Sequence, residues 1–172
     1  MDLSDSFFRR DKRKWYRNMA TIYIFRLFIA ITIMEKSYHP DENQQGTEIA
    51  YKMAYGDQVD VLTTWEWLEY YGLRNTLYPF FLSIPMHILR YLKMDSNYAI
   101  ITSPLYMNAL LQLLGDYYGF ILTERLVNKK CAMIFLSYCL FNSRITELFG
   151  RTMTNGPEAS FAIMAFYYYS KL

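Results

Sequence analysis

Residues 38–74 have the sequence YHPDENQQGTEIAYKMAYGDQVDVLTTWEWLEYYGLR. This stretch is polar and rich in carboxylates and aromatic residues, and it lies between two apolar stretches, residues 19–34 and 77–92. Each apolar stretch is near the length of about 20 residues that a helix needs to cross the hydrocarbon core of a bilayer. The alternation predicts an all-α integral membrane protein in which residues 37–76 form a polar loop outside the bilayer.

The charge distribution predicts the side of the membrane on which this loop lies. The net charge is only +2, which gives no indication of nucleic-acid binding. Positive charge is concentrated just before the first apolar stretch, in Arg9, Arg10, Lys12, Arg13, Lys14 and Arg17. Because basic flanks stay in the cytoplasm, we expect residues 1–17 to be a cytoplasmic arm, residues 18–36 the first membrane helix and residues 37–76 a lumenal loop.

The first apolar stretch can be read as a signal anchor or as a cleavable signal peptide. No small-residue cleavage site follows it, and the polar loop begins at once. These features favour an uncleaved anchor, with the loop in the lumen if this is a multi-pass protein of the endoplasmic reticulum membrane.

The loop itself begins with a predicted helix over residues 41–55. Pro40 suits a first helical position, Asp41 and Glu42 complement the helix dipole, and Gly56 suits the end. One stripe of this helix is apolar, which predicts an amphipathic helix along the membrane surface. The apolar residues are Ile49, Ala50, Met53 and Ala54.

Residues 77–172 are dominated by further apolar stretches, which are typical of membrane helices. These stretches are residues 77–92, 98–126, 131–149 and 159–169. Pro104 and Gly115-Asp116 interrupt the second of them, so it forms either one kinked helix or two short ones. We expect a turn at residues 128–130 and a polar link at residues 151–158.

Some side chains within the apolar stretches need an explanation. A charge in mid-membrane costs about 2.5–3.5 kcal/mol, so Arg26 should face other protein or a polar cavity, in a structural or a functional role. Cys131 and Cys139 have no metal-ligand spacing and are expected to be packing residues. Arg144 and Glu147 are three apart and predict an ion pair within one helix.

The carboxylates of the loop include Asp41, Glu42, Glu48 and Glu66. An inverting glycosyl transfer from a lipid phosphate needs one carboxylate base, and it needs no general acid because a phosphate leaving group is already a weak base. The helix dipole favours the ionised form of Asp41, as that role requires. Ordinary stabilisation of the first helical turn explains Asp41 and Glu42 equally well on spacing alone.

The aromatic and basic residues of the loop also have two readings each. Trp65 and Trp67 flank Glu66 and form either an interfacial aromatic belt or a platform for a sugar. Arg74 binds either a phosphate or lipid headgroups, and His39 either donates to a phosphate or caps the helix.

Taken together, the motifs resemble those of a known family. The segments Pro40-Asp41-Glu42, Thr64-Trp65-Glu66-Trp67, Leu73-Arg74 and Arg151-Thr152-Met153-Thr154-Asn155 occur in the order found in dolichol-phosphate-mannose-dependent α-mannosyltransferases. Gln45, Glu48, Tyr78-Pro79 and Glu158 belong to the same pattern. The chain looks most like the glycosylphosphatidylinositol mannosyltransferases. Its tryptophan block suggests the enzyme that adds the third mannose by a 1,2 linkage, and its His39 the enzyme that adds the fourth.

The resemblance implies a GT-C fold, a multi-helix membrane bundle with a lumenal active site. It implies that Asp41 is the catalytic base and Glu42 its partner. It implies substrate binding by His39, Gln45, Trp65, Glu66, Trp67, Arg74, Arg151 and Asn155. The implied partners are a lipid-linked donor, dolichol phosphate mannose, and a glycolipid acceptor, with no cofactor and no metal.

Such enzymes are about three times longer, so the resemblance covers only an N-terminal part and we expect no activity from this chain alone. Lumenal mannosyltransferases of N-glycan assembly are a further possibility within the family. A non-catalytic membrane subunit, or a truncated paralogue acting in complex assembly, is the alternative function. A small transporter with Arg26 and Asp116 along its pathway is a third.

Overall fold

The computed structural model describes residues 12–36, 43–56, 59–68, 70 and 72–172, and all regular elements in these ranges are helical. The predicted all-α class is therefore confirmed. In chain order the elements are α1 (Lys12–Lys36), a π-helical turn η2 (Asn43–Thr47), α3 (Glu48–Tyr55), a 3-10 turn η4 (Trp65–Trp67), α4 (Leu77–Leu92), α5 (Asn97–Leu126), α6 (Lys129–Phe141), α7 (Ser143–Gly150) and α8 (Asn155–Tyr169).

The predicted loop helix is present, but its first described turn is wider than an α-helix. Residues 43–47 form the π-helical turn η2, and α3 continues to Tyr55. Gly56 ends α3 with a positive φ of 76°, a conformation that glycine adopts without steric cost. The expected helix start at Asp41 and Glu42 lies outside the described residues.

The apolar stripe of α3 is also present, and it packs against another helix. Ala50 and Ala54 are fully buried in a cluster with Leu82 and Met86 of α4. Arg90 of α4 closes the far end of this contact by donating to the carbonyl oxygen of Ala54. The apolar face that we expected along the membrane surface is therefore covered by α4.

The interrupted stretch of residues 98–126 forms one helix rather than two. Ser96 begins α5 as its N-cap, with its Oγ accepting from the N–H of Ala99 at 3.2 Å. Pro104 lies inside the helix and is buried.

The next apolar stretch, residues 131–149, is divided between two helices, α6 and α7. The chain leaves helical geometry at Asn142, which ends α6 and caps α7 by accepting from the N–H of Ile145 at 3.1 Å. An asparagine side chain competes with the backbone for hydrogen bonds and therefore favours such a break. Helix α8 begins at Asn155, so the polar link is only residues 151–154 long.

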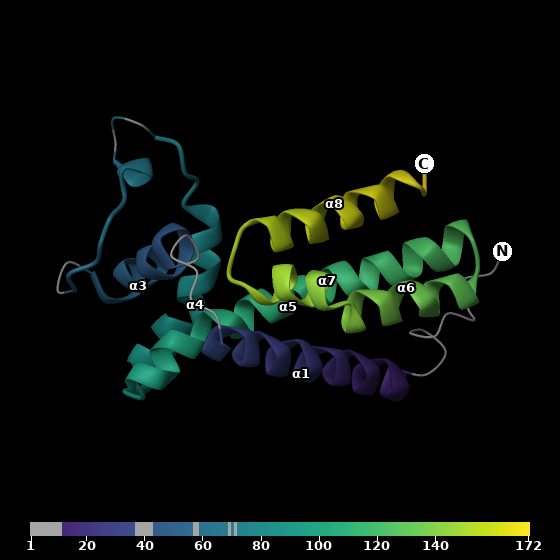
Figure 1. The fold of residues 1–172 in the computed structure, drawn as a ribbon, viewed down its shortest axis with the longest axis horizontal. Helices are drawn as coiled ribbons and strands as arrows, with labels where there is room; N and C mark the ends of the chain where they lie inside the picture. Colours follow the sequence, from purple (N-terminus) through teal and green to yellow (C-terminus); the bar gives the residue numbers. More distant parts are fainter. Residues whose placement is uncertain (1–11, 37–42, 57–58, 69, 71) are drawn as a thin grey trace.

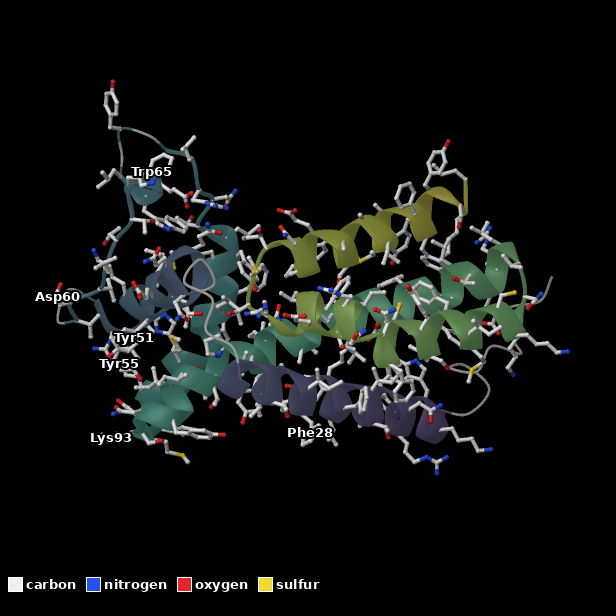
Figure 2. The ribbon with its side chains drawn as sticks, viewed as in Figure 1. Phe28, Tyr51, Tyr55, Asp60, Trp65 and Lys93 are labelled. Atoms are coloured by element: carbon white, nitrogen blue, oxygen red, sulfur yellow. The ribbon has the colours of Figure 1, made fainter. Side chains whose placement is uncertain are left out.

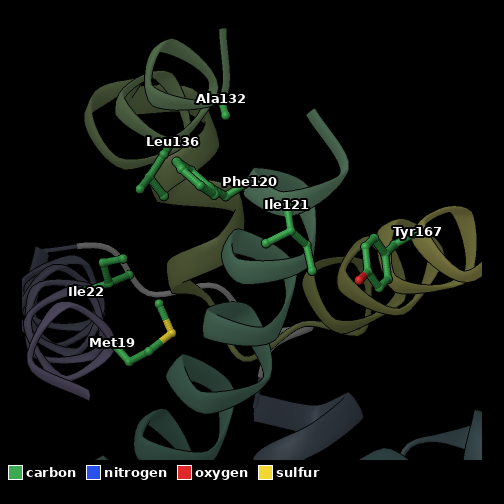
Figure 3. Close-up of a cluster of buried hydrophobic side chains, with 7 residues drawn as sticks. All are labelled: Met19, Ile22, Phe120, Ile121, Ala132, Leu136 and Tyr167. Atoms are coloured by element: carbon green, nitrogen blue, oxygen red, sulfur yellow. The ribbon is translucent and has the colours of Figure 1, made fainter. Parts of the chain in front are cut away.

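Helix α5 is the central element of the fold (Figure 1), and it contacts α1, α4, α6, α7 and α8. The pair α3 and α4 lies at one end of the molecule, while α1, α6 and α8 lie along the rest of α5. Figure 3 shows the main apolar cluster, to which α1, α5, α6 and α8 all contribute. It consists of Met19, Ile22, Phe120, Ile121, Ala132, Leu136 and Tyr167.

Close approach to α5 depends on its glycines. A Cβ atom at position 115 would lie 2.5 Å from Ser160 Oγ of α8, and one at position 119 would lie 2.5 Å from the Phe135 ring of α6. Both distances are shorter than any van der Waals contact allows, so only glycine lets α6 and α8 pack this closely on α5.

An ion pair fixes α1 on α5. Arg26 Nε donates to Asp116 Oδ2 at 2.9 Å, and Arg26 Nη2 donates to Asp116 Oδ1 at 2.7 Å. The two residues are 4% and 5% exposed. Arg26 therefore faces other protein, as expected, and its partner is the carboxylate that we had considered with it as part of a transport pathway.

Across the parts of the chain that are described, none of the helices combines the length and the apolar composition that crossing a bilayer requires.

The buried pair makes a prediction about stability. Asp116→Asn and Arg26→Met should each lower the free energy of unfolding by about 3–5 kcal/mol, because each leaves a buried charge without its counterion. The double variant Arg26→Met/Asp116→Leu should recover most of that loss. Chemical unfolding of the purified chain, followed by circular dichroism, measures all three.

The matched control is Glu147→Gln, which removes the half-exposed partner of Arg151 in an ion pair within four residues of sequence. It should cost less than about 1 kcal/mol. Equal losses at Asp116 and Glu147 would contradict a special role for the buried pair.

Candidate functional site

Two of the sequence motifs meet in space although more than 100 residues separate them. Thr47 Oγ1 of η2 lies 3.4 Å from Thr152 Oγ1 in the link between α7 and α8, within hydrogen-bond reach. A Cβ atom at Gly46 would lie 3.3 Å from the carbonyl oxygen of Thr152 and 3.3 Å from Leu82 of α4. Figure 1 shows the α7–α8 link on the side of the bundle that faces α3 and α4. The η2 segment of the first loop and the Arg-Thr-x-Thr-Asn motif therefore lie against each other.

Asn108 of α5 holds the two sides of this site together. Its Nδ2 donates to the carbonyl oxygens of Phe149 at 3.1 Å and Arg151 at 2.9 Å, and its Oδ1 accepts from the hydroxyl of Tyr78 at 3.3 Å. The side chain is fully buried. It thus connects the start of α4 with the residues that end α7. We did not predict Asn108, although an amide within an apolar stretch of sequence was a signal for it.

Arg151 is buried beside these residues, with 8% of its surface exposed. Its Nη2 donates to Glu147 Oε1 at 3.2 Å. The predicted pair between Arg144 and Glu147 is therefore wrong, because Glu147 faces the next turn of the chain and Arg144 is exposed. Asn155, at the start of α8, is exposed.

The tryptophan block is joined to η2 through one of its two indoles. Trp67 is half-buried and its Nε1 donates to the carbonyl oxygen of Gln44 at 3.2 Å. Trp65 is 55% exposed. Figure 2 shows it on the η4 turn, away from Tyr51 of α3. Trp67 therefore fixes the loop, and Trp65 presents its ring to the outside.

The carboxylate between the tryptophans is bound by Arg74. Arg74 Nε donates to Glu66 Oε2 at 3.0 Å and its Nη2 to Glu66 Oε1 at 3.3 Å, and both side chains are half-buried. A two-point contact of this kind fixes the orientation of both groups. Two of the five guanidinium N–H donors are therefore engaged by Glu66.

The remaining loop residues of interest lie on and around η2. Gln45 and Glu48 are half-buried. One carboxylate oxygen of Glu48, Oε2, is buried and has no hydrogen-bond partner. A buried acceptor without a donor is rare in proteins and marks a place where a hydroxyl or water binds. His39, Asp41 and Glu42 lie outside the described residues and directly precede η2 in the sequence.

Within the described ranges, no three His, Cys, Asp or Glu side chains gather as a metal site would require. The two cysteines are free thiols.

The hydrogen bonds of Asn108 lead to a prediction. Asn108→Leu should destabilise the fold by about 2–5 kcal/mol, because it leaves the carbonyl oxygens of Phe149 and Arg151 buried without a donor. Tyr78→Phe removes one weaker bond and should cost about 1 kcal/mol. Thermal unfolding of the two variants tests this order, and the reverse order would show that Tyr78 rather than Asn108 holds the site.

Comparison with known proteins identifies relatives of the chain. Residues 18–172 match the Alg9-like mannosyltransferase family. The chain is 30% identical to GPI mannosyltransferase 3 of Drosophila melanogaster over 156 residues, which cover 88% of this chain and 26% of the relative. It is 32% identical to GPI alpha-1,2-mannosyltransferase 3 of Bos taurus over 154 residues, which cover 86% of this chain and 27% of the relative. No solved structure matches.

These relatives confirm the resemblance to the glycosylphosphatidylinositol (GPI) mannosyltransferases, and the chain spans about a quarter of their length. The matched residues include the whole site described above, from η2 to Asn155. The chain belongs to the Alg9-like mannosyltransferase family.

Proposed function

We propose that this chain acts in a mannosyltransferase of the endoplasmic reticulum membrane that moves mannose from dolichol phosphate mannose to a GPI-anchor precursor. The observation that carries the proposal is the contact between η2 and the α7–α8 link, where Gly46 and Thr47 meet Thr152. The first-loop segment and the Arg-Thr-x-Thr-Asn motif, which only the family resemblance had connected, are therefore in contact in the folded chain. Since the chain spans about a quarter of its relatives, we expect catalysis to need the polypeptide that they possess beyond the matched region.

In this proposal Asp41 is the base. Its carboxylate takes the proton of the acceptor hydroxyl as that oxygen attacks C1 of the mannose. The bond from C1 to the phosphate oxygen breaks, dolichyl phosphate leaves, and the configuration at C1 inverts. The leaving phosphate is stable as an anion, so no acid is needed. Glu42 orients the base or the acceptor hydroxyl.

The other site residues bind the two substrates. Trp65 is exposed beside Glu66 and is suited to stacking against a sugar face. The unpaired oxygen of Glu48 is suited to accepting from a sugar hydroxyl. Gln45, Trp67, Arg151 and Asn155 complete the proposed set, together with His39 and Arg74.

Exposed apolar side chains support a location within a membrane. Ile24 and Phe28 of α1 are 64% and 67% exposed, and Figure 2 shows Phe28 at the outer side of that helix. On α8 the rings of Phe166 and Tyr169 are 63% and 74% exposed. Large apolar side chains on several helices indicate contact with lipid or with further protein. We propose that they meet the bilayer.

The names of the relatives support the third mannose over the fourth. The Bos taurus relative is a GPI alpha-1,2-mannosyltransferase 3, and the tryptophan block suggested the same step. We therefore propose an alpha-1,2 linkage to the third mannose.

A chimaera tests the proposed function. Residues 18–172 of this chain replace the matching quarter of the Drosophila relative, and the chimaera is expressed in cells that cannot add the third mannose. We expect GPI-anchored proteins to return to the cell surface. Asp41→Asn in the same chimaera should lower this signal by at least about 100-fold, because a general base contributes factors of this order.

Asp60→Asn is the matched control, since Asp60 is an exposed carboxylate of the same loop (Figure 2). It should restore anchoring as the unsubstituted chimaera does. Full activity of Asp41→Asn would refute the assignment of the base. A well-expressed chimaera without activity, in membranes where the unmodified relative works, would contradict the proposed function.

A further inference from the structure

Gln112 of α5 is a buried donor without an acceptor. The side chain is 2% exposed, and its Nε2 is buried and has no hydrogen-bond partner. Nearly all buried amide groups in proteins have a partner, and leaving one without costs free energy. Gln112 lies one helical turn from Asn108, whose amide is fully used. We therefore expect Gln112 Nε2 to donate to an acceptor from outside the described chain.

The first turn of α8 also presents donors without acceptors. Thr154, at the N-cap position, makes no side-chain hydrogen bond to the helix. Pro157 has no N–H group, and the N–H groups of Asn155 and Gly156 donate to none of the described backbone or side-chain acceptors. A helix start of this kind carries partial positive charge and attracts anions.

Gln112 Nε2 lies beside Gly156, in the first turn of α8. A Cβ atom at this position would lie 3.4 Å from Gln112 Nε2 and 3.5 Å from the ring of Phe149. The absence of a side chain lets the amide of Gln112 lie directly against the first turn of α8. Gly156 is buried, whereas Asn155 is exposed. A ligand can therefore approach the first turn of α8 from solvent at Asn155. Gln112 borders the same turn on its buried side.

An acceptor with several oxygens fits this arrangement better than a water molecule. The groups without a described partner are Gln112 Nε2 and two backbone N–H groups, and all three are donors. A buried water needs both donors and acceptors among its partners, whereas an oxyanion needs donors only. Arg151 lies four residues before Asn155 and adds positive charge to this segment, while Glu158 is exposed on the same first turn and opposes it.

We propose that Gln112 and the N-terminus of α8 bind the phosphate of a lipid phosphate ester. In this family site that group is the phosphodiester of the lipid-linked mannose donor and, after transfer, the monoester of the leaving lipid. The proposal rests on the proposed function for the identity of the lipid, but the phosphate chemistry follows from the donors alone. Gln112 then fixes the phosphate on the side of the site formed by α5 and α8.

Binding of a short-chain analogue of the leaving lipid phosphate tests this. The probe is farnesyl monophosphate, with farnesol and inorganic phosphate as comparison ligands, titrated by calorimetry into the 172-residue chain in detergent micelles. The variants are Gln112→Met, which keeps the size and removes the donor, and Gln112→Glu, which replaces the donor by an anion. Circular dichroism and thermal unfolding establish that each variant is folded.

We expect Gln112→Met to weaken binding of farnesyl monophosphate about tenfold, as loss of a hydrogen bond to a charged group does. Gln112→Glu should weaken it further, and farnesol should bind alike to all three proteins. If inorganic phosphate binds as tightly as the farnesyl ester and with the same dependence on Gln112, the result supports a phosphate-binding site whose ligand is free phosphate rather than a lipid phosphate. Unchanged affinity in folded Gln112→Met overturns the proposal.

The chimaera separates this inference from the proposed function. Gln112→Met in an active chimaera should raise the KM for the donor more than it lowers kcat. If mannosylation is restored and Gln112→Met has no effect on it, the phosphate site is refuted and the function stands. If mannosylation fails while farnesyl monophosphate binds through Gln112, the site stands and the function is refuted.

Discussion

A stripe of buried polar side chains on one face of α5 constrains the whole structure. Asn108, Gln112 and Asp116 follow each other at intervals of four residues, so they lie on the same side of the helix. All three are at most 5% exposed. A buried polar group without a partner costs free energy, so each must meet a complementary group. The elements around α5 are placed where they supply these groups.

Two members of the stripe, Asn108 and Asp116, each bind a different neighbour. Asp116 takes the guanidinium of Arg26 and so places α1. Asn108 takes the carbonyl oxygens at the end of α7 and the hydroxyl of Tyr78, which places the start of α4. Phe149 is shared between them, since its carbonyl binds Asn108 and its ring lies 5.9 Å from the Arg26 guanidinium. Stability and site geometry therefore depend on the same helix face.

The site lies between packed helices and a loop. On one side are α5 and the ends of α7 and α8, which approach closely at glycine. On the other side is the loop, whose described contacts include Trp67 on Gln44, Arg74 on Glu66 and Thr47 near Thr152.

Sequence patterns predicted the local parts of this structure well. The apolar stripe of α3 and the stop at Gly56 were read correctly, because helical periodicity and the conformational freedom of glycine act within a few residues. The break at Asn142 was missed, since apolar composition on both sides concealed a capping residue. The pairing of Glu147 was also misread, because two arginines lie within four residues of it and only the conformation of the chain decides between them.

By itself, the sequence determined the helical class, the polar loop between apolar helices and the ordered motifs of the family. Only the tertiary structure decided that Arg26 pairs with Asp116, that Thr47 meets Thr152, that Asn108 binds the carbonyl of Arg151, and that Gln112 is buried without a partner for its Nε2. The reason is physical: these contacts join residues far apart along the chain, and they depend on how closely and at what angle helices cross. Glycines and buried polar groups set that crossing, and their partners cannot be identified from a local pattern.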